Sequence, residues 1–88
     1  MSAETYLNHP NFGLLFRVCL VDEHQELFTT LYAQRLFFIA KTGGGLSFEP
    51  VARNDARLIL ENRLRILRRA GHSTELQRLQ RMYKQTFQ

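Results

Sequence analysis

The sequence has 88 residues and one cysteine, which allows a single small domain and excludes an internal disulfide. Its hydrophobic content of 44% and charged content of 23% exclude wholesale disorder, and no apolar stretch approaches the roughly 20 residues needed to cross a bilayer. The net charge of +4 is unevenly distributed: residues 1–53 hold four basic and five acidic side chains, whereas residues 54–88 hold eight basic and three acidic ones.

The first half of the chain carries the pattern of short β-strands. Apolar segments rich in β-branched and aromatic residues predict strands at 12–21, 27–32, 36–41 and 46–51. The polar residues 22–26 predict a connection, and the glycines at 43–45 predict a turn because they offer no side chain to pack. So many short antiparallel strands in so few residues predict a small, strongly bent sheet or barrel.

The second half predicts a helical hairpin. Helical spacing predicts a first apolar stripe of Ala56, Leu60, Leu64 and Leu67, and a second of Leu76, Leu79, Met82 or Tyr83, and Phe87. Asn54 or Asp55 can cap the first helix, and Gly71 is placed to end it in a left-handed conformation. The sequence therefore predicts a β+α protein with a β domain over residues 1–53 and two helices over 54–88.

No residue pattern assembles a catalytic or metal site. The three histidines, His9, His24 and His72, are far apart in the sequence and none lies beside a cysteine pair. Cys19 falls within an apolar strand, where we expect a buried and inert thiol. The glycine run lacks the Lys-Ser/Thr ending of a phosphate-binding loop. We therefore expect no enzymatic activity, no metal and no cofactor bound by this chain.

The segment Leu36–Ala40 suggests a docking surface because it does not alternate between apolar and polar residues. One face of the sheet fills the core, and the other is either covered by the helical hairpin or left for a partner. Around Tyr32, the side chains of Gln34, Leu36 and Phe38 combine aromatic anchors with hydrogen-bonding groups, as interface centres do. The arginine-rich helices leave three interpretations open: a solvated face, docking onto an acidic protein, or contact with nucleic-acid phosphates.

Four segments resemble the PipX family, the cyanobacterial PII-interacting proteins X: ETYLNHP at 4–10, FGLL at 12–15, LFTTLYAQRLFF at 27–38 and ENRLR at 61–65. The resemblance implies a Tudor-like β domain followed by two helices. It also implies a nitrogen-signalling adaptor and transcriptional coactivator that binds either trimeric PII, when 2-oxoglutarate is scarce and ADP is favoured, or the dimeric activator NtcA, when 2-oxoglutarate is abundant. In that family pattern, 2-oxoglutarate, ADP and ATP bind the partners.

The same resemblance implies that one face serves both partners, so that their binding is mutually exclusive. Tyr32 matches the central contact, with Tyr6, Gln34, Leu36 and Phe38 around it, and Leu64 and Arg68 match positions on the first helix. We expect a cytoplasmic protein that is monomeric alone and does not bind nucleic acid specifically. The alternative is a small basic nucleic-acid-binding protein, argued from the isoelectric point of 9.8.

Overall fold

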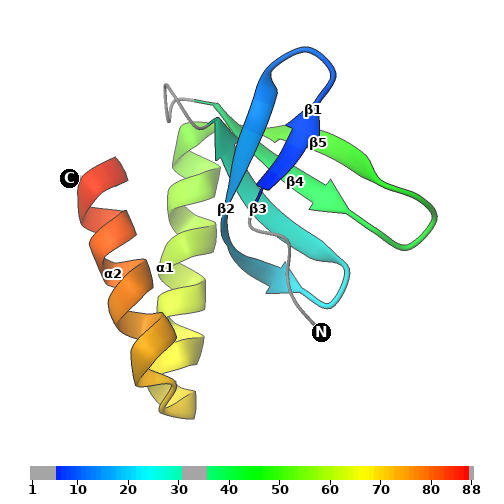
Figure 1. The fold of residues 1–88 in the computed structure, drawn as a ribbon. Helices are drawn as coiled ribbons and strands as arrows, with labels where there is room; N and C mark the ends of the chain where they lie inside the picture. Colours follow the sequence, from blue (N-terminus) through cyan, green and yellow to red (C-terminus); the bar gives the residue numbers. More distant parts are fainter. Residues whose placement is uncertain (1–5, 31–35, 88) are drawn as a thin grey trace.

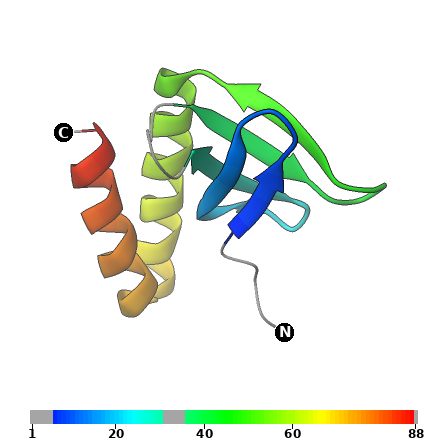
Figure 2. The same cartoon turned by 45° about the horizontal axis from the view of Figure 1, so that its top comes forward.

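The computed structural model describes residues 6–30 and 36–87. It shows an antiparallel sheet of five strands that curls into a half-barrel, with two helices lying side by side against it (Figures 1 and 2). Each strand pairs with the next along the chain. The elements are β1 (Tyr6–His9), β2 (Gly13–Asp22), β3 (Gln25–Thr30), β4 (Phe37–Lys41), β5 (Ser47–Val51), α1 (Arg53–Ala70) and α2 (Ser73–Phe87). The predicted β+α architecture is confirmed.

Two features of the sheet differ from the sequence-based expectation. β1 was not predicted as a strand, and it forms a hairpin with β2 in which Tyr6 lies opposite Phe16. The predicted connection at 22–26 is shorter, because Asp22 already pairs with Gln25 across a tight turn. An Asp22 carboxylate oxygen accepts a hydrogen bond from the backbone N–H of His24 at 2.9 Å, which lets polar residues form this turn without a longer loop.

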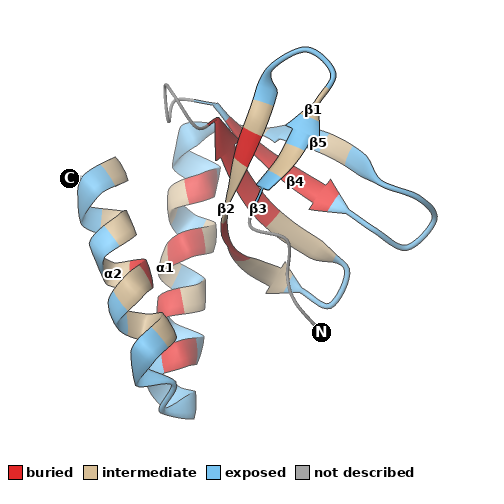
Figure 3. Ribbon diagram, in the orientation of Figure 1, coloured by how far each residue is buried: buried red, intermediate tan, exposed pale blue. Residues whose placement is uncertain are grey.

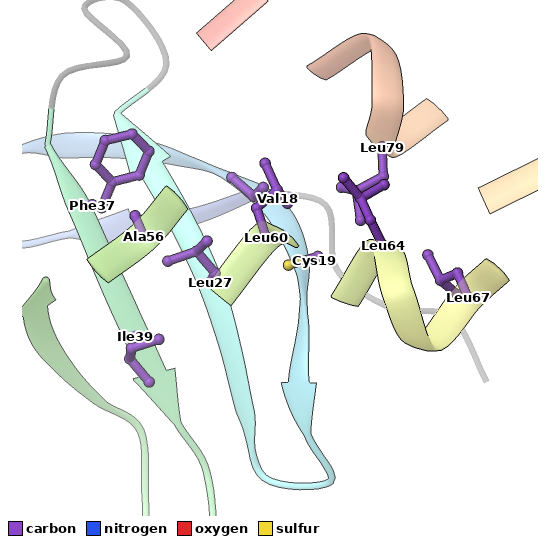
Figure 4. Close-up of a cluster of buried hydrophobic side chains, with 10 residues drawn as sticks. All are labelled: Val18, Cys19, Leu27, Phe37, Ile39, Ala56, Leu60, Leu64, Leu67 and Leu79. Atoms are coloured by element: carbon purple, nitrogen blue, oxygen red, sulfur yellow. The ribbon is translucent and has the colours of Figure 1, made fainter. Parts of the chain in front are cut away.

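The larger core lies between the sheet and the helices. Phe37 and Ile39 of β4 point toward α1, where they pack with its apolar stripe (Figure 4). Cys19 is fully buried in the same cluster, as predicted. The first helical stripe is buried as predicted, and Leu79 of α2 completes the cluster. The helices and the sheet therefore share one core.

A second core fills the concave side of the sheet. Phe38 and Ala40 alternate with Phe37 and Ile39 along β4, so they face the opposite side, where they pack with Leu15 and Phe28. This side is enclosed because the edge strands curl toward each other. The ring of His9 on β1 lies 4.9 Å from that of Phe48 on β5.

The two cores explain why residues 36–40 do not alternate between apolar and polar side chains. The sequence left open whether the helices cover the second face of the sheet or a partner does. In the described part of the chain, the helices cover one face and the curled sheet encloses the other by itself (Figure 3). Of the residues in this segment, only Leu36 remains largely exposed.

The ends of α1 show one wrong prediction and one correct one. Neither Asn54 nor Asp55 caps the helix, because it begins earlier, with Ala52 at the capping position and no side-chain hydrogen bond there. Gly71 ends it as predicted, with a φ of 76° and a backbone N–H that donates to the Leu67 carbonyl at 3.0 Å.

Contacts at both ends hold α2 in place. Near its C-terminus, Phe87 stacks on Phe37 with 5.6 Å between ring centroids, and the Arg53 guanidinium lies 5.0 Å from the Phe87 ring. Nearer its start, Arg78 donates a hydrogen bond to the Val18 carbonyl at 3.2 Å. These contacts fasten the second helix to the sheet as well as to α1.

Candidate docking surface

The connection between β3 and β4 starts from a well-defined base. The carbonyl of Leu36 accepts hydrogen bonds from the backbone N–H of Thr30 at 3.1 Å and from the hydroxyl of Thr29 at 2.9 Å. Both threonines are buried. Tyr32, the predicted central contact, and Gln34, a predicted neighbouring contact, fall between these anchors and lie outside the described residues, so their role stays a prediction.

Two other predicted contact residues are exposed beside this base. Tyr6 is 48% exposed and Leu36 is 43% exposed. Tyr6 lies opposite Phe16 on β2, with 5.8 Å between ring centroids. Phe16 pairs with Thr29, and the Leu36 carbonyl accepts from the next residue, Thr30, so Tyr6 and Leu36 belong to neighbouring rungs at one end of the sheet, and their side chains leave it on opposite faces. We call this region, made of Tyr6, Phe16, Thr30 and Leu36, the Tyr6–Leu36 surface.

Phe38 is not part of that exposed surface. Only 3% of it is accessible, and its ring lies 4.9 Å from that of His9 and 5.4 Å from that of Phe12. In this structure Phe38 supports the concave core below the surface. A direct contact between Phe38 and a partner remains a prediction.

Leu64 and Arg68 lie elsewhere in the molecule. Leu64 is 9% exposed and packs in the core that α1 shares with α2. Arg68 is exposed in the last turn of α1, about 22 Å along the helix axis from Arg53, where both helices extend away from the sheet (Figures 1 and 2). The structure therefore places Tyr6 and Leu36 at the same end of the sheet, on opposite faces, and places Leu64 and Arg68 elsewhere, on the helices.

Sequence reasoning missed three aromatic residues that shape this region. Phe16 supports Tyr6 from the neighbouring strand, while His9 and Phe12 cover Phe38. Nδ1 of His9 accepts hydrogen bonds from the backbone N–H groups of Asn11 at 3.0 Å and Phe12 at 3.3 Å, which fixes the β1–β2 turn. The sequence of β1, Tyr-Leu-Asn-His, does not alternate apolar with polar residues, so no strand signal was available there.

Cys19 is a structural thiol. Burial raises its pKa from 9.0 to about 12, although nearby Arg63 and Arg78 act in the opposite direction. In the described residues no group of three histidine, cysteine or acidic side chains could hold a metal ion. This arrangement offers neither an activated nucleophile at Cys19 nor a metal centre in that part of the chain.

The buried thiol predicts a specific pH dependence. Burial keeps the Cys19 thiol protonated in the folded state. The protonated thiol therefore stabilises the fold fully below its ordinary pKa of 9.0, and this stabilisation is lost as the pH rises toward about 12. Near neutral pH, alkylation of Cys19 by iodoacetamide should be at least about a hundredfold slower in the native protein than in denaturant. Equal rates in the two states would contradict the burial of this thiol.

A comparison with known proteins shows to which family this sequence is similar. The sequence model of a family described as PipX: PII-interacting protein X matches residues 3–87, which is nearly the whole chain. No curated protein matches the sequence. Over the residues that the structure describes, no helix has the length and hydrophobicity needed to cross a membrane.

Proposed function

Because the chain belongs to the PipX family of PII-interacting proteins, we propose that it is a non-enzymatic adaptor that binds PII through the Tyr6–Leu36 surface. The observation that carries this proposal is the exposure of two large apolar side chains, Tyr6 and Leu36, at the end of the sheet where β3 ends and β4 begins. Large apolar and aromatic residues at a rigid sheet end are typical of interface centres. Tyr32 and Gln34 complete the proposed contact.

The proposal includes a second partner that uses the same surface. The resemblance described above supports NtcA in its 2-oxoglutarate-bound form, and this protein would act as its coactivator in nitrogen regulation. One surface cannot be buried by two proteins at once, so PII and NtcA compete by their affinities. The metabolites set those affinities by binding the partners, and coactivation follows if this chain binds the active form of NtcA more tightly than the inactive form. The proposal places this exchange in the cytoplasm.

Two leucines offer a matched test of the surface. Leu36→Ala should weaken PII binding about fivefold to thirtyfold, because it removes an apolar contact beside the predicted centre. Leu46→Ala should leave binding within about twofold, because Leu46, although 52% exposed, precedes β5 at the opposite end of β4. Isothermal titration calorimetry with purified PII in the presence of ADP measures both.

Both variants remove an exposed side chain of the same type, so their folds should be equally stable. Unchanged PII affinity in Leu36→Ala, or an equal loss in Leu46→Ala, would show that PII does not dock at the Tyr6–Leu36 surface. Complete absence of PII binding by the unmodified protein would contradict the proposed function itself.

A further inference from the structure

A groove runs between the two helices. Its volume is about 230 Å3, and its lining residues are Leu64 on α1 with Gln80, Tyr83 and Lys84 on α2. At one end the Tyr83 hydroxyl donates a hydrogen bond to a Glu61 carboxylate oxygen, which joins the two helices. That hydrogen bond raises the pKa of Tyr83 and keeps its hydroxyl protonated.

Uncompensated positive charge flanks this groove. Arg68 follows Leu64 by four residues, so it lies one turn along the same face of α1, and Lys84 lines the groove from α2. The acidic residues Glu61 and Glu75 are each paired with an arginine of the hairpin, Arg57 at 3.2 Å and Arg63 at 3.7 Å. Within residues 6–30 and 36–87, neither Arg68 nor Lys84 has a carboxylate within 4.0 Å.

The floor of the groove and its rims therefore differ in chemistry. The apolar part of the lining is the exposed edge of Leu64, which is 9% accessible, and the ring of Tyr83, and the volume suits one large apolar side chain. Lys84 lines the groove itself, and Arg68 lies one turn beyond Leu64 on α1, next to the lining residues. An occupant that satisfies both must place an apolar residue between acidic ones.

We propose that this groove, which we call the Leu64–Lys84 groove, is a second docking site for an acidic amphipathic helix of a partner protein. Such a helix carries apolar residues at intervals of three and four on one face and can carry carboxylates beside them. Packed against α1 and α2, it would form a three-helix arrangement in which its carboxylates meet Arg68 and Lys84. Nucleic acid fits less well, because a phosphate backbone leaves the apolar floor without a complement.

This inference goes beyond the proposed function and does not depend on it. The groove lies on the helical hairpin, apart from the Tyr6–Leu36 surface, so the chain could hold one partner at the sheet and another at the helices. Leu64 and Arg68, which lie away from the other predicted contact residues, would then belong to this second docking site. Failure of PII binding would leave the test of the groove unaffected.

A synthetic peptide tests the proposal on the full-length protein. The probe is a fluorescein-labelled helix of about 18 residues, with leucines at helical spacing on one face and glutamates beside them. Fluorescence anisotropy should show saturable binding that the double variant Arg68→Glu/Lys84→Glu weakens at least about tenfold. Gln80→Trp should also block binding, because its larger side chain fills the groove without changing charge.

The matched control is Arg69→Glu/Arg81→Glu, which changes the net charge by the same amount at two exposed positions outside the lining residues. It should cost less than about threefold, because long-range attraction alone is screened by salt. Equal losses in the two double variants would overturn the proposal, and so would equal binding of a peptide whose leucines are replaced by serine. Preferential binding of a single-stranded oligonucleotide that depends on Arg68 and Lys84 would overturn it in favour of nucleic acid.

Discussion

Tyr32→Ala should weaken the binding of both PII and NtcA by at least about 2 kcal/mol each, or about thirtyfold in Kd. The base of the segment that contains Tyr32 is held by two hydrogen bonds to the Leu36 carbonyl, and exposed Tyr6 and Leu36 lie beside it. An aromatic anchor at the centre of such a surface carries a large share of the binding energy. Calorimetric titration of each partner, with 2-oxoglutarate present for NtcA, measures the two losses.

Tyr32→Phe is the conservative control, because it keeps the ring and removes only the hydroxyl. We expect it to retain each affinity within about tenfold. A loss confined to one partner in Tyr32→Ala would mean that PII and NtcA use different anchors, which contradicts a shared surface. Circular dichroism of both variants should match that of the unmodified protein.

Phe38→Ala should destabilise the protein by about 3–5 kcal/mol, a large fraction of the total for a chain of this size. Phe38 is 3% exposed and packs between the concave core and the rings of His9 and Phe12. Its removal leaves a cavity where the two edge strands approach each other. Urea denaturation followed by circular dichroism measures the loss.

Phe38→Leu separates the structural role of Phe38 from a role in partner contact. A leucine fills most of the same space, so we expect a cost of less than about 2 kcal/mol and a folded protein. PII binding by this variant should remain within about threefold of normal. A folded Phe38→Leu variant that binds PII much more weakly would show that Phe38 itself contacts the partner, as the family resemblance implies.

Most of the architecture could be predicted because local patterns specify it. The apolar run of β2 exceeds what a surface helix allows, and the helical spacing from Ala56 to Leu67 places four residues on one buried face. Gly71 ends α1 because its left-handed conformation is strained for residues that carry a Cβ. These features depend on residues close together in the sequence.

The strong bend of the sheet was predicted, but the way its curl brings the two edge strands together could not be, because it depends on contacts between distant residues. β1 is short, and it becomes evident only through its register with β2 and the approach of His9 to Phe48. Without that curl, the concave face looked like a surface that required the helices or a partner. The chain instead encloses this face with its own aromatic side chains.

The same contacts explain why the candidate site was predicted only in part. Leu36 and Phe38 are two residues apart and lie on one face of the sheet, yet His9 and Phe12 cover only Phe38. Leu64 belongs to the apolar stripe of α1, and the packing of α2 against it decides its burial. Exposure, which separates a contact residue from a core residue, is a property of the folded chain.

A competition experiment measures whether one surface serves both partners. Labelled protein is first assembled with PII in the presence of ADP, and NtcA with 2-oxoglutarate is then added while sedimentation velocity follows the label. A parallel sample that receives 2-oxoglutarate alone corrects for its effect on PII. We expect the label to move from the PII complex to the NtcA complex, with no species that contains all three proteins. A stable ternary complex would contradict the shared surface.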